Sequence, residues 1–88
     1  MHDKHIIFGV HITDRVKNAP DIQRILTQYG CNIKTRIGLH HVADNQCSPR
    51  GLILLEMHGD EQICRELFDA LARHEGVQVK EMVFDHPA

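Results

Sequence analysis

The apolar residues of this chain alternate between two periodicities, in an order that few folds accommodate. Residues 5–13 carry apolar side chains at every second position, as in a strand buried on one face. The segment that follows repeats them every three or four positions, as in an amphipathic helix. The whole pattern predicts, in order, a strand at 5–13, a helix between 18 and 30, strands at 31–42 and 51–58, a helix between 60 and 76, and a strand at 77–84.

Residues typical of helix ends support the two predicted helices. Asn18 is a plausible N-cap with Pro20 in the first turn, and Gly30 supplies the C-terminal stop. Asp60 can cap the second helix, which we expect Gly76 to end.

The order βαββαβ predicts an α+β fold of the ferredoxin-like type. With right-handed crossovers, it gives a four-stranded antiparallel sheet in which the first and third strands are central and two helices cover one face. At 88 residues the chain is long enough for one domain, spanning residues 1–88, and too short for two.

The two faces of this sheet differ in composition. The side that we expect the helices to cover takes mainly aliphatic residues: Ile6, Phe8, Val10, Ile12, Ile33, Ile37, Leu39, Ile53, Leu55, Met57, Val79 and Val83. Glu81 falls on that side too, which suggests a bulge or a sheet edge. The opposite side mixes aliphatic residues with charges and histidines: Ile7, Gly9, His11, Lys34, Arg36, Gly38, His40, Leu52, Leu54, Glu56, His58, Lys80, Met82 and Phe84. Because subunit interfaces have this mixed character, we expect a homodimer or homotetramer that uses this side.

Charge and hydropathy exclude several classes of partner. Ten Lys plus Arg residues stand against 12 Asp plus Glu, for a formal charge of −2, so we expect no direct binding to nucleic acid. Apolar runs are short and the first residues lack signal-peptide character, so we expect a cytoplasmic protein with no membrane span. The three cysteines form no disulfide framework, and we expect free thiols.

Imidazoles and a thiol gather where the second strand is expected to end. His40 and His41 are followed by Cys47 in a polar stretch, and the parallel first strand brings His11 to the same sheet edge. Nitrogen and sulfur ligands suit nickel or zinc. Because neighbouring strand residues point to opposite faces, we expect His40 on the side of His11, and His41 with Cys47. The alternative is a solvated polar loop that binds no metal.

A second candidate site lies at the entry to the first helix. Asp14, Arg15 and Asn18 surround backbone N–H groups that can receive a carboxylate or phosphate, although such a turn is more often only a cap. The sequence holds no Ser/His/Asp order, HExxH, P-loop or GxGxxG motif, so a small enzyme is the less favoured alternative.

From His5 to Phe84 the chain resembles the small ACT-like regulatory domains, most closely the iron-only hydrogenase system regulators. The resemblance is carried by Asp14-Arg15, by Ile25-Leu26-Thr27-Gln28-Tyr29-Gly30-Cys31-Asn32-Ile33-Lys34-Thr35-Arg36-Ile37-Gly38-Leu39-His40, and by Cys47-Ser48-Pro49-Arg50-Gly51-Leu52-Ile53-Leu54-Leu55-Glu56. It implies a non-catalytic, ligand-sensing module that works as a homo-oligomer and takes a small-molecule effector between the turn around Asp14, Arg15 and Asn18 and a neighbouring subunit.

A more distant resemblance is to the C-terminal domain of the nickel-responsive repressors, which is ACT-like, tetrameric and binds nickel through histidines and a cysteine at subunit contacts. His41 and Cys47 match the spacing of two of those ligands. Leu39 stands where another histidine is expected, and the remote histidine has no clear match, although His11 can substitute spatially. The repressors' ribbon-helix-helix segment has no counterpart here, so we expect no direct regulation of DNA. The resemblance implies a transition-metal sensor as the alternative function.

Overall fold

The computed structural model describes residues 4–13, 15–43 and 46–85, with the backbone alone described at 15–19, 39–43 and 46–50. The elements are β1 (Lys4–Ile12), α1 (Arg15–Gln28), a short 3-10 turn (Gly30–Asn32), β2 (Ile33–Ala43), β3 (Gln46–Met57), α2 (Glu61–Ala72) and β4 (Val77–Asp85). The predicted order βαββαβ is confirmed.

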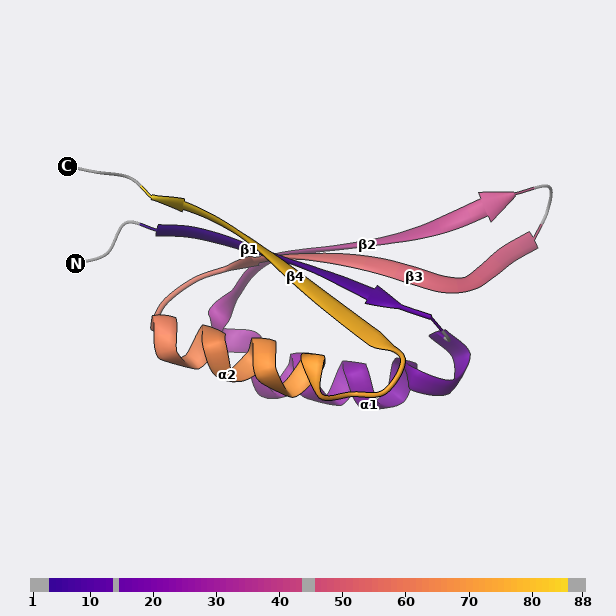
Figure 1. Ribbon diagram of the computed structural model, residues 1–88, viewed down its shortest axis with the longest axis horizontal. Helices are drawn as coiled ribbons and strands as arrows, with labels where there is room; N and C mark the ends of the chain where they lie inside the picture. Colours follow the sequence, from indigo (N-terminus) through magenta and orange to yellow (C-terminus); the bar gives the residue numbers. More distant parts are fainter. Residues whose placement is uncertain (1–3, 14, 44–45, 86–88) are drawn as a thin grey trace.

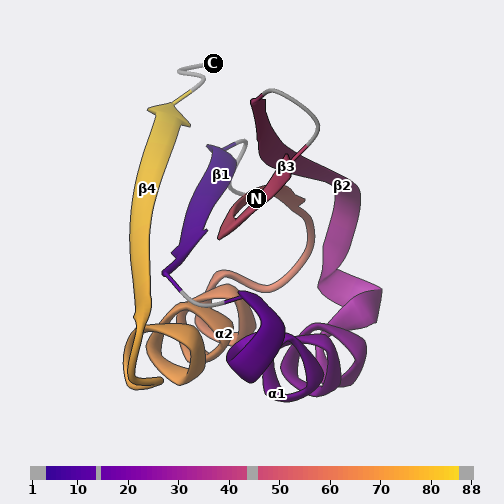
Figure 2. The same cartoon turned by 90° about the vertical axis from the view of Figure 1, so that its right-hand side faces the viewer.

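The four strands form one antiparallel sheet in the order β2-β3-β1-β4. As predicted, β1 and β3 are central. Both helices pack against one face of the sheet, and neither lies on the other face (Figures 1 and 2). Neither helix in the described part of the chain is long and apolar enough to cross a membrane.

The core lies between the helices and the sheet. The buried residues are Ile6, Phe8, Val10 and Ile12 from β1, Ile22 and Leu26 from α1, Leu55 and Met57 from β3, and Cys64, Leu67 and Leu71 from α2. The Phe8 ring packs edge-on against Phe68, with ring centroids 5.3 Å apart. The expected inward face of β1 is therefore confirmed, as is that of β3 at Leu55 and Met57.

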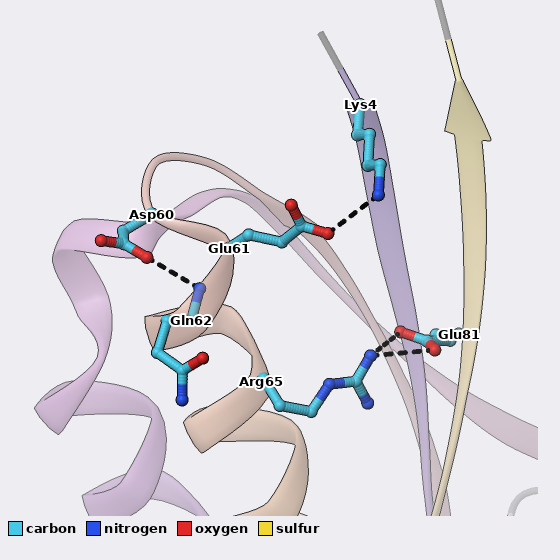
Figure 3. Close-up of polar contacts among 6 residues, drawn as sticks. All are labelled: Lys4, Asp60, Glu61, Gln62, Arg65 and Glu81. Carbon is cyan, nitrogen blue, oxygen red and sulfur yellow. Dashed lines mark hydrogen bonds and ion pairs between the residues drawn. The ribbon is translucent and has the colours of Figure 1, made fainter. Parts of the chain in front are cut away.

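The start of α2 follows the sequence signal, whereas the start of α1 does not. Asp60 caps α2, because its Oδ1 accepts a hydrogen bond from the Gln62 amide at 2.7 Å (Figure 3). α2 ends at Ala72, earlier than the predicted stop at Gly76, whose positive φ of 81° suits glycine in the turn that follows. The prediction of Asn18 as N-cap is wrong, since α1 begins at Arg15 and has Pro20 inside it.

The early start of α1 follows from the way β1 ends. The Thr13 amide and hydroxyl both donate to the Gly76 carbonyl, at 2.9 and 3.0 Å, which ties the end of β1 to the turn before β4. The chain then enters the helix within two residues. Gly30 also differs from its predicted role, because it opens the 3-10 turn and does not have the positive φ of a left-handed cap.

A bulge near the start of β2 reverses which face its side chains take. Ile33 pairs with Met57 and Thr35 with Glu56, so Lys34 is an extra residue on β2. Every later residue of β2 is therefore shifted by one position relative to simple alternation. Ile37 lies opposite Leu54 and is 49% exposed, so its predicted place under the helices is wrong. The backbone of Leu39 pairs with that of Leu52, and the Leu39 side chain lies outside the described residues.

The polar stretch predicted as a loop is largely strand. β2 runs to Ala43 and β3 begins at Gln46, five residues earlier than predicted. The pairing with β1 stops at Gly51, so the first part of β3 is bonded to β2 alone. Pro49 is tolerated there because β3 has a neighbour on one side only. In Figure 1 this hairpin projects beyond the end of β1.

The edge position of β4 explains the carboxylate on the helix-covered face. Glu81 accepts two hydrogen bonds from Arg65 Nη2 of α2, at 3.0 and 2.9 Å, and Lys4 pairs with Glu61 at 3.0 Å (Figure 3). The Arg65 guanidinium also lies 4.8 Å from the Phe68 ring centroid. The predicted edge at Glu81 is confirmed, and its charge is balanced by the helix above it.

Candidate functional site: the open face of the sheet

We call the side of the sheet opposite the helices the open face. The described side chains that the register assigns to it are His5, Ile7 and His11 from β1, Thr35 and Ile37 from β2, Leu52, Leu54 and Glu56 from β3, and Gln78, Lys80, Met82 and Phe84 from β4, with Gly9 in their midst. Three of its large apolar residues are about half exposed: Ile37 (49%), Met82 (51%) and Phe84 (50%). These three residues, with the half-buried Ile7, Leu52 and Leu54, make the face apolar over all four strands.

A polar cluster lies within this apolar surface. Thr35 Oγ1 donates to Glu56 Oε1 at 2.7 Å, and the His5 ring Nε2 lies 2.9 Å from Glu56 Oε2. The three residues come from β2, β3 and β1, and Glu56 retains 26% of its side-chain exposure. The Thr35 hydroxyl, then the His5 ring, lowers the pKa of Glu56, with a smaller effect of the Lys34 charge. The carboxylate therefore stays ionised across the physiological range.

Sequence reasoning did not find this cluster, because simple alternation put Thr35 on the other side of the sheet. The available signal was the pairing of a threonine with a glutamate across two strands, and it becomes visible only after the bulge at Lys34 is known. The local sequence gives no sign of that bulge.

The predicted metal ligands are only partly placed. His11 lies on the open face, opposite Leu52 and half-buried. His40 pairs with Gly51, which pairs with Ile12, so it occupies the row next to that of His11. The His40 side chain is not described, so the expectation that it shares a face with His11 stays a prediction.

The remaining metal candidates lie on the projecting hairpin. Cys47 pairs with Val42, which places the backbone of His41 one position from this pair on the facing strand. The register is irregular between His40 and Val42. The side chains of His40, His41 and Cys47 lie outside the described residues. Among the side chains that are described, no group of three or more His, Cys, Asp and Glu residues is placed to hold a metal ion.

The predicted effector residues are placed by the backbone alone. Asp14 lies outside the described residues, and Arg15 and Asn18 belong to the first turns of α1 without described side chains. Just before these residues, the Thr13 amide and hydroxyl donate hydrogen bonds to the Gly76 carbonyl, and these bonds fix where α1 begins.

A second polar cluster connects the two helices. His74 Nε2 lies 3.2 Å from Asp21 Oδ2, and Arg24 also pairs with Asp21 at 3.2 Å. The Glu75 carbonyl, then the Asp21 carboxylate, raises the pKa of His74, whereas the His74 hydrogen bond and the Arg24 charge lower that of Asp21. This cluster lies on the helix-covered side of the sheet, away from the open face.

Comparison with known proteins identifies relatives by fold. No family matches the sequence, and no curated protein matches it. The uncharacterized protein TM1266 from Thermotoga maritima is similar in structure, with a TM-score of 0.78 and 23% identity over 94% of this chain and 100% of that one. CPII from Thiomonas intermedia K12, a nitrogen regulatory PII-like protein bound to ADP, AMP and bicarbonate, has a TM-score of 0.56 and 12% identity over 100% of both chains. CutA1 from Oryza sativa has a TM-score of 0.58 and 9% identity over 99% of this chain and 85% of that one. At these identities the likeness shows a shared ferredoxin-like fold.

Proposed function

We propose that this chain is a non-catalytic, ligand-sensing regulatory module that works in the cytoplasm as a homo-oligomer. The observation that carries the proposal is the apolar open face, which has no helix over it in the described structure. The similarity in fold to a PII-like nitrogen regulatory protein supports a regulatory role. A catalytic role, the less favoured alternative, has no recognisable catalytic motif in the sequence.

A second copy of the chain is the occupant that best fits the open face. A chain of 88 residues buries a small core, so an additional contact adds a large fraction of its stability. Ile37, Met82 and Phe84 are each about half exposed, and fully burying a large apolar side chain stabilises by about 1.5–3 kcal/mol. We propose a dimer or tetramer in which this face is the contact.

For the effector, we propose a small anionic molecule at the start of α1. Helix N-termini bind carboxylates and phosphates through free backbone N–H groups, and Asp14, Arg15 and Asn18 are the residues available there. The PII-like protein of the same fold binds ADP, AMP and bicarbonate, which are all anions. Nucleotides and amino acids are therefore the classes to test.

A thermal-shift screen tests the effector. We expect one of these anions to raise the melting temperature of the wild type, and Arg15→Ala to abolish the shift. Arg36→Ala, which removes an exposed arginine from β2, is the matched control and should respond like the wild type. The assignment fails if no compound stabilises the fold, or if Arg15→Ala keeps the full response.

The projecting hairpin supports a second candidate function, that of a nickel or zinc sensor. The backbones of His41 and Cys47 lie on the two paired strands of the hairpin, one position apart. Nitrogen and sulfur ligands favour nickel and zinc over magnesium. Since each face of one sheet offers at most two of the four candidate ligands (His11, His40, His41 and Cys47), we propose that a complete site draws ligands from two chains. Because bound histidine and cysteine must be deprotonated, affinity should fall as the pH drops through about 6.5.

Calorimetry with nickel and zinc tests the metal proposal. The wild type should bind, and His41→Ala and Cys47→Ser should each weaken binding by about tenfold or more. Cys31→Ser, which removes an exposed thiol elsewhere, should bind like the wild type. Equal, millimolar-range binding by the wild type, His41→Ala and Cys47→Ser would reject the site.

A further inference from the structure

Two opposite charges of the open face lie on either side of β1: the Glu56 carboxylate, on which the Lys34 charge also acts, and the Lys80 ammonium group. Glu56 lies in the row of Ile7 and Met82, and Lys80 in the next row of the same face, with Gly9 and Leu54. Two strand spacings of about 4.8 Å and one step of about 6.7 Å along the strands separate the two charges. They are therefore about 12 Å apart, too far to pair within one chain, and the midpoint between them falls on β1.

The Glu56 carboxylate and the Lys80 ammonium group can both form further hydrogen bonds. Glu56 is bonded to Thr35 and lies against His5, and an ionised carboxylate can accept about four hydrogen bonds. Lys80 is exposed, and its ammonium group has no acceptor among the described residues. Both groups thus have unused capacity on a surface that is otherwise largely apolar.

The midpoint lies between Ile7 and Gly9 on β1, and Gly9 is not required by the fold of its own chain. Its φ is not positive, and a Cβ there would make only ordinary contacts, 3.9 Å from Leu54 Cδ2 and 4.0 Å from the Lys80 carbonyl oxygen. Glycine inside a central strand costs stability relative to other residues. Such a glycine often marks the close approach of another backbone.

We propose that two copies pack open face to open face about a two-fold axis over β1, with Glu56 of each chain paired to Lys80 of the other. A two-fold axis in the plane between the faces exchanges the two positions on either side of it, so both pairs form together. Beside the axis, Ile7 contributes an apolar side chain to the contact, whereas Gly9 adds no side chain. This inference rests on the proposed self-association and specifies its geometry.

Charge exchange tests the pairing. Glu56→Lys and Lys80→Glu should each weaken dimerisation by about tenfold or more, because each creates two like-charge contacts across the axis. The double variant Glu56→Lys/Lys80→Glu should return the dissociation constant to within about threefold of the wild type. Glu81→Lys is the matched control, since its carboxylate lies on the helix-covered face, and it should leave dimerisation unchanged. Sedimentation gives the constants, and circular dichroism verifies the fold.

Gly9→Val provides an independent readout that does not depend on charge. It should leave the monomer folded and at least as stable as the wild type, yet weaken dimerisation by about tenfold or more, because two added side chains meet at the axis. A double charge variant that stays as weak as the singles, or a Gly9→Val dimer of wild-type strength, overturns the proposed geometry. If Leu54→Asp still breaks the oligomer in that case, self-association through the open face stands. A monomeric wild type overturns both.

Discussion

Phe8 of β1 and Phe84 of β4 differ in burial, so replacing each with alanine should have different effects. The Phe8 substitution should weaken folding, whereas the Phe84 substitution should leave the folding of the monomer nearly unchanged. Phe8 is 1% exposed and packs edge-on against Phe68, so Phe8→Ala leaves a cavity in the core and should cost about 3–5 kcal/mol of unfolding free energy. A chain of 88 residues is stabilised by about 4–13 kcal/mol in total. The substitution therefore removes a large share of the stability.

Phe84 is 50% exposed on the open face, and Phe84→Ala should change the unfolding free energy of the monomer by only about 0.5 kcal/mol. Urea unfolding followed by far-ultraviolet circular dichroism measures both effects, in a Leu54→Asp background so that association does not contribute. Phe8→Ala should lower the urea midpoint by about 2 M, with an unchanged dependence on urea. Equal costs for the two substitutions would refute the assignment of one ring to the core and the other to the open face.

Two further predictions concern titratable groups on the helix-covered side of the sheet. The Glu75 carbonyl and the Asp21 carboxylate raise the pKa of His74, so this stabilisation is complete below the ordinary histidine value and is lost as the pH rises through the raised pKa. The difference in urea midpoint between the wild type and His74→Gln should be larger near pH 5.5 than near pH 8.5, and equal differences would contradict it. Burial raises the pKa of the Cys64 thiol, whereas Cys31 is exposed, so a thiol reagent should label Cys31 before Cys64 in the folded protein. Mass mapping that finds Cys64 labelled as fast as Cys31 would show that the Cys64 side chain of α2 is not buried in the core.

The sequence predicted the elements and the sheet order because periodicity and helix ends are local signals. The inward face of β1 and the edge at Glu81 were predicted for the same reason. The start of α1 was missed because it depends on a tertiary contact, the two Thr13 bonds to the Gly76 carbonyl. The face of Ile37 was missed because one extra residue at Lys34 reverses the alternation.

The candidate site was predicted in its general character and missed in its detail. The mixed composition of the open face is visible in the sequence, because strands one, three and four keep strict alternation. The Thr35–Glu56–His5 cluster is not, since it joins three strands that come together only through the register. The long hairpin was read as a loop because its polar residues, including Pro49, resemble a turn.

Light scattering across a range of concentrations tests the central claim most directly, namely that a second copy of the chain covers the open face. The wild type should be a dimer or tetramer at micromolar concentration, and Leu54→Asp, which places a charge in the middle of the face, should be a folded monomer by circular dichroism. A wild type that is monomeric at these concentrations, or a Leu54→Asp variant that assembles as the wild type does, would contradict the account.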